Sequence, residues 1–123
     1  MALAFKRILG VSFDIQIFEW LGLAETDTSP PHISIPHMSK VTLQLLAITG
    51  LPTVQLEGSL NLDSDGTKVW SLLNDVLGAE ISLAGAGAIV FALESVNLIR
   101  PIITAGTTVT ADIRIMGSQP ARQ

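Results

Sequence analysis

The chain has 123 residues, no cysteine and a formal net charge of −4, so it predicts a single domain without disulfides or thiolate metal sites. Its seven Lys and Arg residues form no cluster, which argues against nucleic-acid binding, because that needs a cationic face. Apolar residues make up 48% and charged residues 15%, against about 25% charged in a typical soluble domain. This deficit favours a homo-oligomer or a larger assembly. A compact β-sandwich with a Ser/Thr-rich exterior is the alternative.

The first fourteen residues resemble a secretory signal only briefly. The apolar run after Lys6 and Arg7 ends at Asp14, and no small-residue cleavage site follows it closely. No stretch reaches the roughly 18 uncharged apolar residues that a membrane helix needs. We therefore expect a protein made in the cytoplasm, with no membrane partner.

Residues 1–24 are predicted to form an extended N-terminal arm. Within it, hydrophobic residues from Val11 to Ile17 alternate with polar ones, which is typical of a half-buried strand. More apolar residues follow. We expect the arm to contact other subunits while the rest of the chain folds without it. The candidate interface residues are Phe13, Ile15, Ile17, Phe18, Trp20 and Leu21.

A proline-rich linker is predicted at residues 25–38. Its three prolines and small polar residues exclude a helix and favour an extended path. A structureless loop of this length is unusual inside a compact domain. The arm before it is therefore expected to dock on its own domain, on a neighbouring subunit or on another protein.

Residues 39–117 are predicted to form a β-domain, followed by a flexible tail at 118–123. In its first strand Val41, Leu43, Leu45 and Ala47 share one face. Trp70 is expected to anchor the core. Residues 89–93 form a continuous apolar run, as expected of a central strand. The further strands are predicted near residues 54–59, 69–73, 81–83, 98–104 and 107–115.

Turn signals recur about every ten residues along this domain, between segments rich in β-branched residues. Examples are Gly50 with Pro52, Asp65 with Gly66, and Ala105 with Gly106. Such spacing predicts an all-β fold, a β-sandwich or jelly roll of about seven to eight antiparallel strands.

The catalytic and metal-binding candidates are few. The two histidines, His32 and His37, lie in the linker, which is a poor place to hold catalytic geometry. Residues 63–66 resemble the start of a calcium loop, but Lys68 and apolar residues follow where oxygen ligands should be. An Asp-Gly turn explains them more simply. We expect no catalytic residue, no metal and no cofactor.

The remaining candidates also have simpler explanations. Residues 85–88, Gly-Ala-Gly-Ala, lack the Lys and Ser/Thr of a phosphate loop and predict a tight turn. Trp20 and Trp70 are the candidates for stacking on a sugar, but six aromatic residues supply a carbohydrate platform poorly. The carboxylates that a glycosidase would need have no feature that pairs them. They are Glu57, Glu80 and Glu94.

Several segments together resemble small structural proteins of tailed-bacteriophage virions, especially the head decoration or cement type. The resemblance covers about residues 42–117 and consists of turns and strands rather than a catalytic signature. Related segments occur in β-sandwich sugar-binding modules. The segments are residues 53–59, the 65–67 turn with Trp70, residues 75–78 before 81–83, residues 99–101 and residues 104–110.

The resemblance implies a protein on the outside of a capsid shell, often a trimer, whose partner is the major capsid protein. It implies a virion location after synthesis in the host cytoplasm, and no catalytic residues. Two other functions remain open from the sequence. One is a carbohydrate-binding or host-recognition fibre module; the other is a tail or connector component of the same virion.

Overall fold

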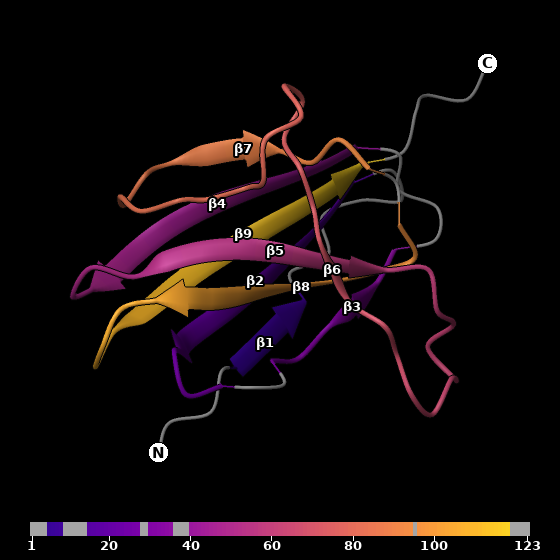
Figure 1. The fold of residues 1–123 in the computed structure, drawn as a ribbon, viewed down its shortest axis with the longest axis horizontal. Coiled ribbons are helices and arrows are strands. Elements are labelled where there is room, and N and C mark those ends of the chain that lie inside the picture. Colours follow the sequence, from indigo (N-terminus) through magenta and orange to yellow (C-terminus); the bar gives the residue numbers. More distant parts are fainter. Residues whose placement is uncertain (1–4, 9–14, 28–29, 36–39, 95, 119–123) are drawn as a thin grey trace.

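The computed structural model describes residues 5–8, 15–27, 30–35, 40–94 and 96–118, and all of its regular elements are strands (Figure 1). Nine strands form two antiparallel sheets. The larger sheet has the order β1-β2-β9-β4-β7 and the smaller sheet β3-β8-β5-β6. The strands are β1 (Phe5–Ile8), β2 (Ile15–Ala24), β3 (Ile33–Ser34), β4 (Lys40–Thr49), β5 (Thr53–Ser59), β6 (Ser71–Leu72), β7 (Ile89–Phe91), β8 (Leu98–Ala105) and β9 (Thr110–Ser118).

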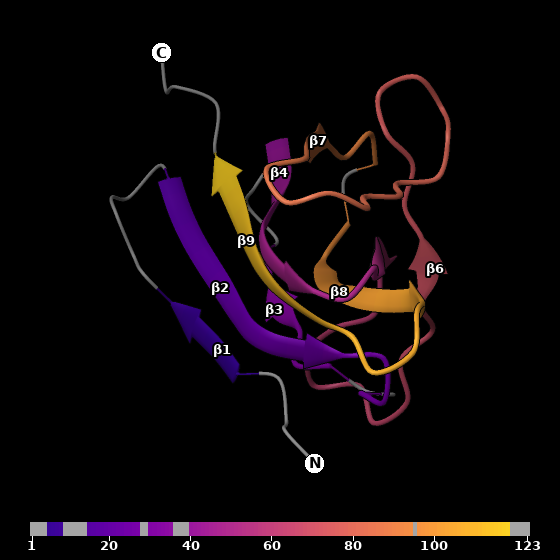
Figure 2. The same ribbon diagram turned by 90° about the vertical axis from the view of Figure 1, so that its left-hand side faces the viewer.

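The two sheets pack face to face, as Figure 2 shows from the side. Successive strands of one sheet are often distant in sequence: β9 lies between β2 and β4, and β8 lies between β3 and β5. Chain crossings of this kind between two sheets are typical of sandwiches and jelly rolls. The predicted all-β sandwich class is therefore confirmed.

Residues 15–24 belong to the domain itself. Strand β2 pairs with β1 on one side and with β9 on the other, from Ile15↔Ser118 to Ala24↔Thr110. Two of its side chains, Trp20 and Leu23, are fully buried in the core. The interpretation of residues 1–24 as an arm that the domain can fold without is therefore wrong for β2, because its removal would strip an inner strand from the larger sheet.

The proline-rich segment is also held against the sandwich where the structure describes it. Ile33 and Ile35 are buried, and β3 pairs with β8. The indole Nε1 of Trp20 donates a hydrogen bond to the carbonyl oxygen of Pro31 at 2.7 Å. A buried indole N–H needs an acceptor, and Pro31 supplies it. The bond therefore ties the linker to the core side of β2.

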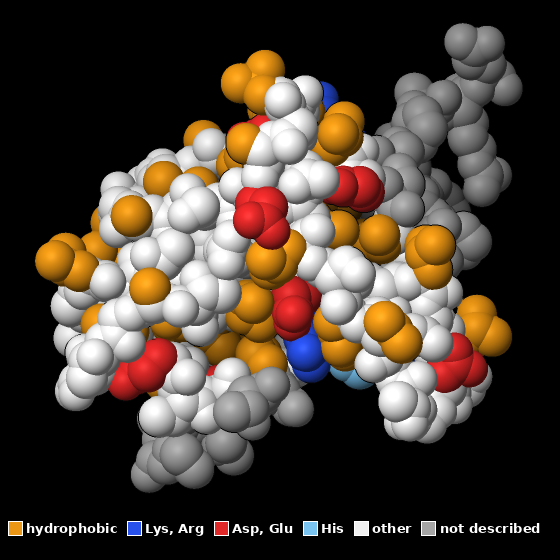
Figure 3. Space-filling view, viewed as in Figure 1, with side chains coloured by type: hydrophobic (Ala, Val, Ile, Leu, Met, Phe, Trp, Pro, Cys, Tyr) orange, Lys and Arg blue, Asp and Glu red, His pale blue; other side chains and the backbone are white. Residues whose placement is uncertain are grey.

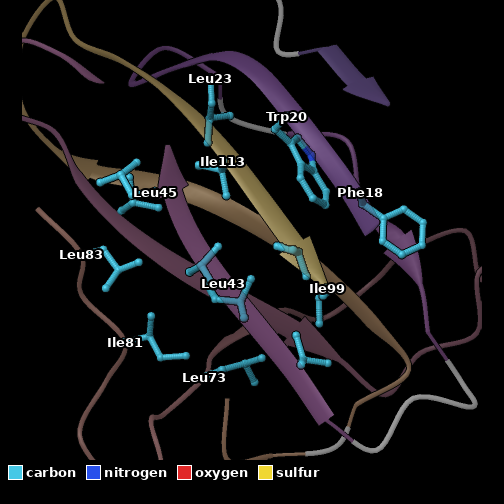
Figure 4. Packing of buried hydrophobic residues seen from close by; sticks show 14 of the residues in the cluster. Phe18, Trp20, Leu23, Leu43, Leu45, Leu73, Ile81, Leu83, Ile99 and Ile113 are labelled. Carbon is cyan, nitrogen blue, oxygen red and sulfur yellow. The ribbon is translucent and has the colours of Figure 1, made fainter. Parts of the chain in front are cut away.

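The apolar core lies between the sheets (Figure 4). It is built by alternation: inward side chains of β2, β9, β4 and β5 are separated by outward ones. Gly58 is part of this packing, because a Cβ there would lie 2.8 Å from Cδ2 of Leu73. The largest fully buried side chains are Trp20, Leu23, Leu43, Leu45, Leu56, Ile81, Leu98, Ile99, Ile113, Ile115, Val54 and Pro52.

Two strand predictions need correction. Val41, Leu43 and Leu45 do share the buried face of β4, but Ala47 is exposed. The register of β4 against β9 shifts between Leu45 and Ala47, and an extra residue at a β-bulge reverses the alternation. The apolar run at residues 89–93 is not a central strand. It contributes β7, an edge strand of three residues whose Ile89 and Phe91 face solvent.

The position of β2 leads to a stability prediction. Replacing the fully buried Leu23 with Ala should lower the free energy of unfolding by about 2–5 kcal/mol, because it removes apolar contacts and leaves a cavity. Thermal or denaturant unfolding followed by circular dichroism measures this. Leu77→Ala, at a side chain that is 91% exposed, is the matched control and should change stability by less than about 0.5 kcal/mol. Equal stability of the two variants would mean that β2 is not part of the core.

Candidate functional site

Exposed apolar side chains lie on part of the outer side of the larger sheet. One row of paired residues crosses four strands: Ile17 on β2, Met116 on β9, Thr42 on β4 and Phe91 on β7. Their side chains point away from the core, because the inward positions of the same strands are taken by the buried residues. Phe91 is 43% exposed, Met116 36% and Ile89 60%. We call the apolar residues of this surface, Ile15, Ile17, Ile89, Phe91 and Met116, the sheet face.

The sheet face has a shallow groove of about 210 Å³ and a positive charge. Lys40 places its Nζ 5.1 Å from the centroid of the Phe91 ring, and Arg114 lines the groove. Nε of Arg114 donates to Oε2 of Glu19 at 2.7 Å, with the Arg114 side chain 46% exposed and that of Glu19 3%. Glu19 balances the charge of Arg114, so Lys40 is the cation that gives this surface its positive charge.

The predicted interface residues divide between the sheet face and the core. Ile15 and Ile17 lie on the sheet face, and Leu21 is half-buried. Phe18 and Trp20 are 5% and 0% exposed and pack in the core of their own chain, so their prediction as interface residues is wrong. Gln16 and Glu19 interrupt the apolar residues without a strict alternation, and the pairing of β2 with β9 shows which side each residue takes. Phe13 lies outside the described residues.

A second cluster lies on the outer side of the smaller sheet around Trp70. The guanidinium carbon of Arg100 lies 4.1 Å from the centroid of the Trp70 ring, and its Nε donates to Glu57 at 2.9 Å. The His32 ring lies 5.7 Å from the Trp70 ring, and its Nε2 is 2.7 Å from an oxygen of Asp63. Trp70 is half-buried and is absent from the core cluster, so its prediction as a core anchor is wrong.

A larger groove, of about 580 Å³, lies beside the segment between β5 and β6. We call it the loop groove. Leu60, Leu62 and Val69 are 77%, 62% and 70% exposed along it. Its lining includes two carboxylates, Asp65 and Glu94, and no Lys or Arg. The full lining is Gly58, Ser59, Leu60, Asn61, Leu62, Asp65, Val69, Ser71, Leu72, Leu73, Glu94 and Val96.

Hydrogen bonds hold the two carboxylates of the loop groove in place. Oδ2 of Asp65 accepts from Nδ2 of Asn61 at 3.0 Å and from the backbone N–H of Leu62 at 2.9 Å. The Asn61 bond, then the Leu62 bond, lowers the pKa of Asp65 below its ordinary value of 3.8. Glu94 accepts two bonds from Asn74, both at 2.8 Å. Neither carboxylate has the geometry of a metal site with its neighbours.

The other candidates occupy turns or separate contacts. At residues 63–66, Asp65 caps its own loop, whereas Asp63 pairs with His32. Residues 85–88 form a turn, with the N–H of Ala88 donating to the carbonyl of Gly85 at 3.0 Å. Within the described segments no three metal-ligating side chains gather. Glu57 and Glu94 have different partners, Glu80 is exposed, and His37 lies outside the described residues.

Comparison with known proteins gives no family. The sequence matches no model of a protein family and no curated protein. Among solved structures, the fold is similar to the crystal structure of a cupin domain from Bordetella pertussis Tohama I, at a TM-score of 0.38 and 14% identity over 94% of each chain. Among the described residues, none forms a helix long and apolar enough to cross a membrane.

Asp65 gives the loop groove a predicted pH dependence. Its folded-state pKa lies below the ordinary value, so the stability it contributes is fully present above about pH 3.8 and is lost as the pH falls through the folded pKa. The Asp65→Ala variant should not show this fall in the stability of the loop as the pH is lowered. Amide NMR signals of residues 61–69 recorded against pH measure it, with Ser64→Ala as the control. Identical acid profiles for the wild type and Asp65→Ala would contradict the assignment.

Proposed function

We propose that the protein is a non-enzymatic structural component of a virion, a decoration or cement protein that binds the outside of a phage head. It stabilises contacts between major capsid subunits and acts as a homo-oligomer, with a trimer favoured. The single observation that carries the proposal is the sheet face, an exposed apolar surface on a folded β-sandwich. The resemblance of residues 42–117 to virion proteins supports it.

The physical basis of the activity is burial of apolar surface across subunit boundaries. Solvent exposure of Ile89, Phe91 and Met116 on one side of one sheet is unfavourable for an isolated monomer. Each of these side chains gains about 25 cal/mol for every Å² of apolar area that a partner covers. A protein that binds only the assembled shell shifts the assembly equilibrium toward that shell by mass action. No reacting group is required.

The proposal predicts which substitutions weaken binding to heads. Phe91→Ser should reduce the affinity at least tenfold, about 1.4 kcal/mol, because an aromatic side chain is a strong interface anchor. The measurement is co-sedimentation with heads assembled from the major capsid protein of the same virus. Leu51→Ser is the control, since Leu51 is 84% exposed on a turn outside the sheet face.

Two results would contradict the proposal. One is wild-type protein that stays in the supernatant with intact heads at every concentration tested. The other is equal binding by Phe91→Ser and by the Leu51→Ser control. Immunogold labelling of intact particles separates the head from the tail, and label confined to the tail would assign the protein to the tail or connector.

A second candidate function rests on Trp70. Trp20 is buried, so a carbohydrate-binding or host-recognition module would have to use the half-buried Trp70, whose ring contacts Arg100 and His32. Aromatic rings beside hydrogen-bonding groups bind sugars through stacking. The cluster has both components, which is the specific observation in favour of this function.

Tryptophan fluorescence tests the second candidate. If Trp70 stacks on a sugar, host surface glycans should change the emission of the wild type, and Trp70→Phe should abolish the change while the emission of buried Trp20 persists. Thermal unfolding of Trp70→Phe controls for folding. Wild-type emission that stays constant up to millimolar glycan would exclude this function.

A further inference from the structure

The sheet face and the loop groove are complementary in charge. Both carry exposed apolar side chains, but the sheet face presents Lys40, with Arg114 paired to Glu19, whereas the loop groove is lined by Asp65 and Glu94, with Lys68 bonded to the carbonyl of Asp65. Asp63, whose side chain is 63% exposed, adds a further carboxylate beside Leu62. Figure 3 shows hydrophobic side chains next to acidic ones on the side of the molecule that carries β5 and β6.

We propose that copies of this chain associate head to tail, with the sheet face of one copy packed on the loop groove of the next. The inference rests on the proposed function only in treating the sheet face as an assembly surface. Apolar side chains on the two surfaces cover one another, and Lys40 beside Phe91 meets the carboxylates around Leu62. Opposite charges at an interface set its orientation and exclude wrong pairings.

The two surfaces lie at different places on the molecule. A contact between them is therefore heterologous, which means that the two copies use different surfaces. Figure 2 shows β1 and β2 on one side of the molecule and β6, whose residues line the loop groove, on the other. A contact between different surfaces leaves one of each unused in every pair, so association continues until a ring closes or an open chain forms. A closed ring of three copies would account for the trimer that the proposed function favours.

A symmetric contact between two sheet faces is disfavoured by charge. It would bring Lys40 of one copy toward Lys40 of the other, while the acid of that surface, Glu19, is 2% exposed and already bonded to Arg114. Like charges brought together at an interface cost several kcal/mol. The loop groove offers the opposite charge.

Two variants, each with one surface disabled, test the arrangement. The face variant carries Lys40→Glu and Ile89→Ser, both at exposed positions, and leaves the Arg114–Glu19 pair intact. The groove variant carries Asp63→Lys and Leu62→Ser. The control pair carries Glu80→Lys and Leu51→Ser, an exposed acid and an exposed leucine outside both surfaces. Circular dichroism confirms folding of each variant.

Sedimentation velocity of the purified full-length proteins gives the expected results. Wild type and the control should form oligomers larger than dimers, whereas each disabled variant alone should sediment as a monomer. An equimolar mixture of the face and groove variants should form a heterodimer and nothing larger, because each supplies the one surface that the other lacks. Mixing a disabled variant with the control should shorten the oligomers.

Other outcomes overturn the inference. A groove variant that dimerises alone would show a symmetric contact between sheet faces, and a monomeric wild type at 100 micromolar (about 1 mg/ml) would show that copies do not associate. Failure of the proposed function is distinguishable, because head binding is measured separately. If the wild type binds heads as a monomer, the proposed function stands and the head-to-tail association is contradicted. If it forms oligomers that do not bind heads, the association stands and the proposed function is contradicted.

Discussion

The pairing of β9 with both β2 and β4 is the constraint on which the rest of the molecule depends. It joins β2, which precedes the linker, β4, which follows it, and the last strand, β9, into one sheet. Because side chains alternate along each strand, this register places Trp20, Ile113 and Leu45 inward as one row of paired positions. The same register places Ile17, Met116 and Phe91 outward together. The same strand register therefore determines both which residues form the core and which form the sheet face.

The fold class was predictable because strand and turn signals are local. Turns at Gly50, Asp65 and Gly106 are set by neighbouring residues, and Gly50 and Gly106 do adopt positive φ values of 76° and 117°. Pairing partners are not local. The sequence does not reveal that β2 and β9, almost a chain length apart, are neighbours. That is why residues 15–24 gave the pattern of a separate arm although they form an inner strand.

The candidate site was predictable only in part, for a related reason. Ile15 and Ile17 were predicted as interface residues, and the structure places them on the outward side of β2, where a partner could reach them. Phe91 and Ile89 were assigned to the interior, because a continuous apolar run is typical of a central strand. The run lies at a sheet edge instead. Its apolar outward side chains are the signal of a binding surface, and that signal appears only once the edge position is known.

The two tryptophans show how tertiary context reverses an expectation based on composition. Trp20 sits where β2 faces the smaller sheet, and its one polar atom reaches the Pro31 carbonyl, so the ring can be fully buried at no cost in unpaired groups. Trp70 precedes a two-residue edge strand, where Arg100 covers one part of the ring and His32 another.

The fold also decides which of the chain's few charged residues are balanced by an opposite charge. Two carboxylates on the strands are matched by arginines, Glu19 by Arg114 and Glu57 by Arg100. Those pairs use two of the seven Lys and Arg residues. Asp65 and Glu94 are instead held mainly by amides and backbone N–H groups, which fix a carboxylate without neutralising it. Lys68, whose Nζ donates to the carbonyl of Asp65, is the one cation among these contacts, so of the two groove carboxylates Glu94 is held by Asn74 alone in the contacts that the structure describes.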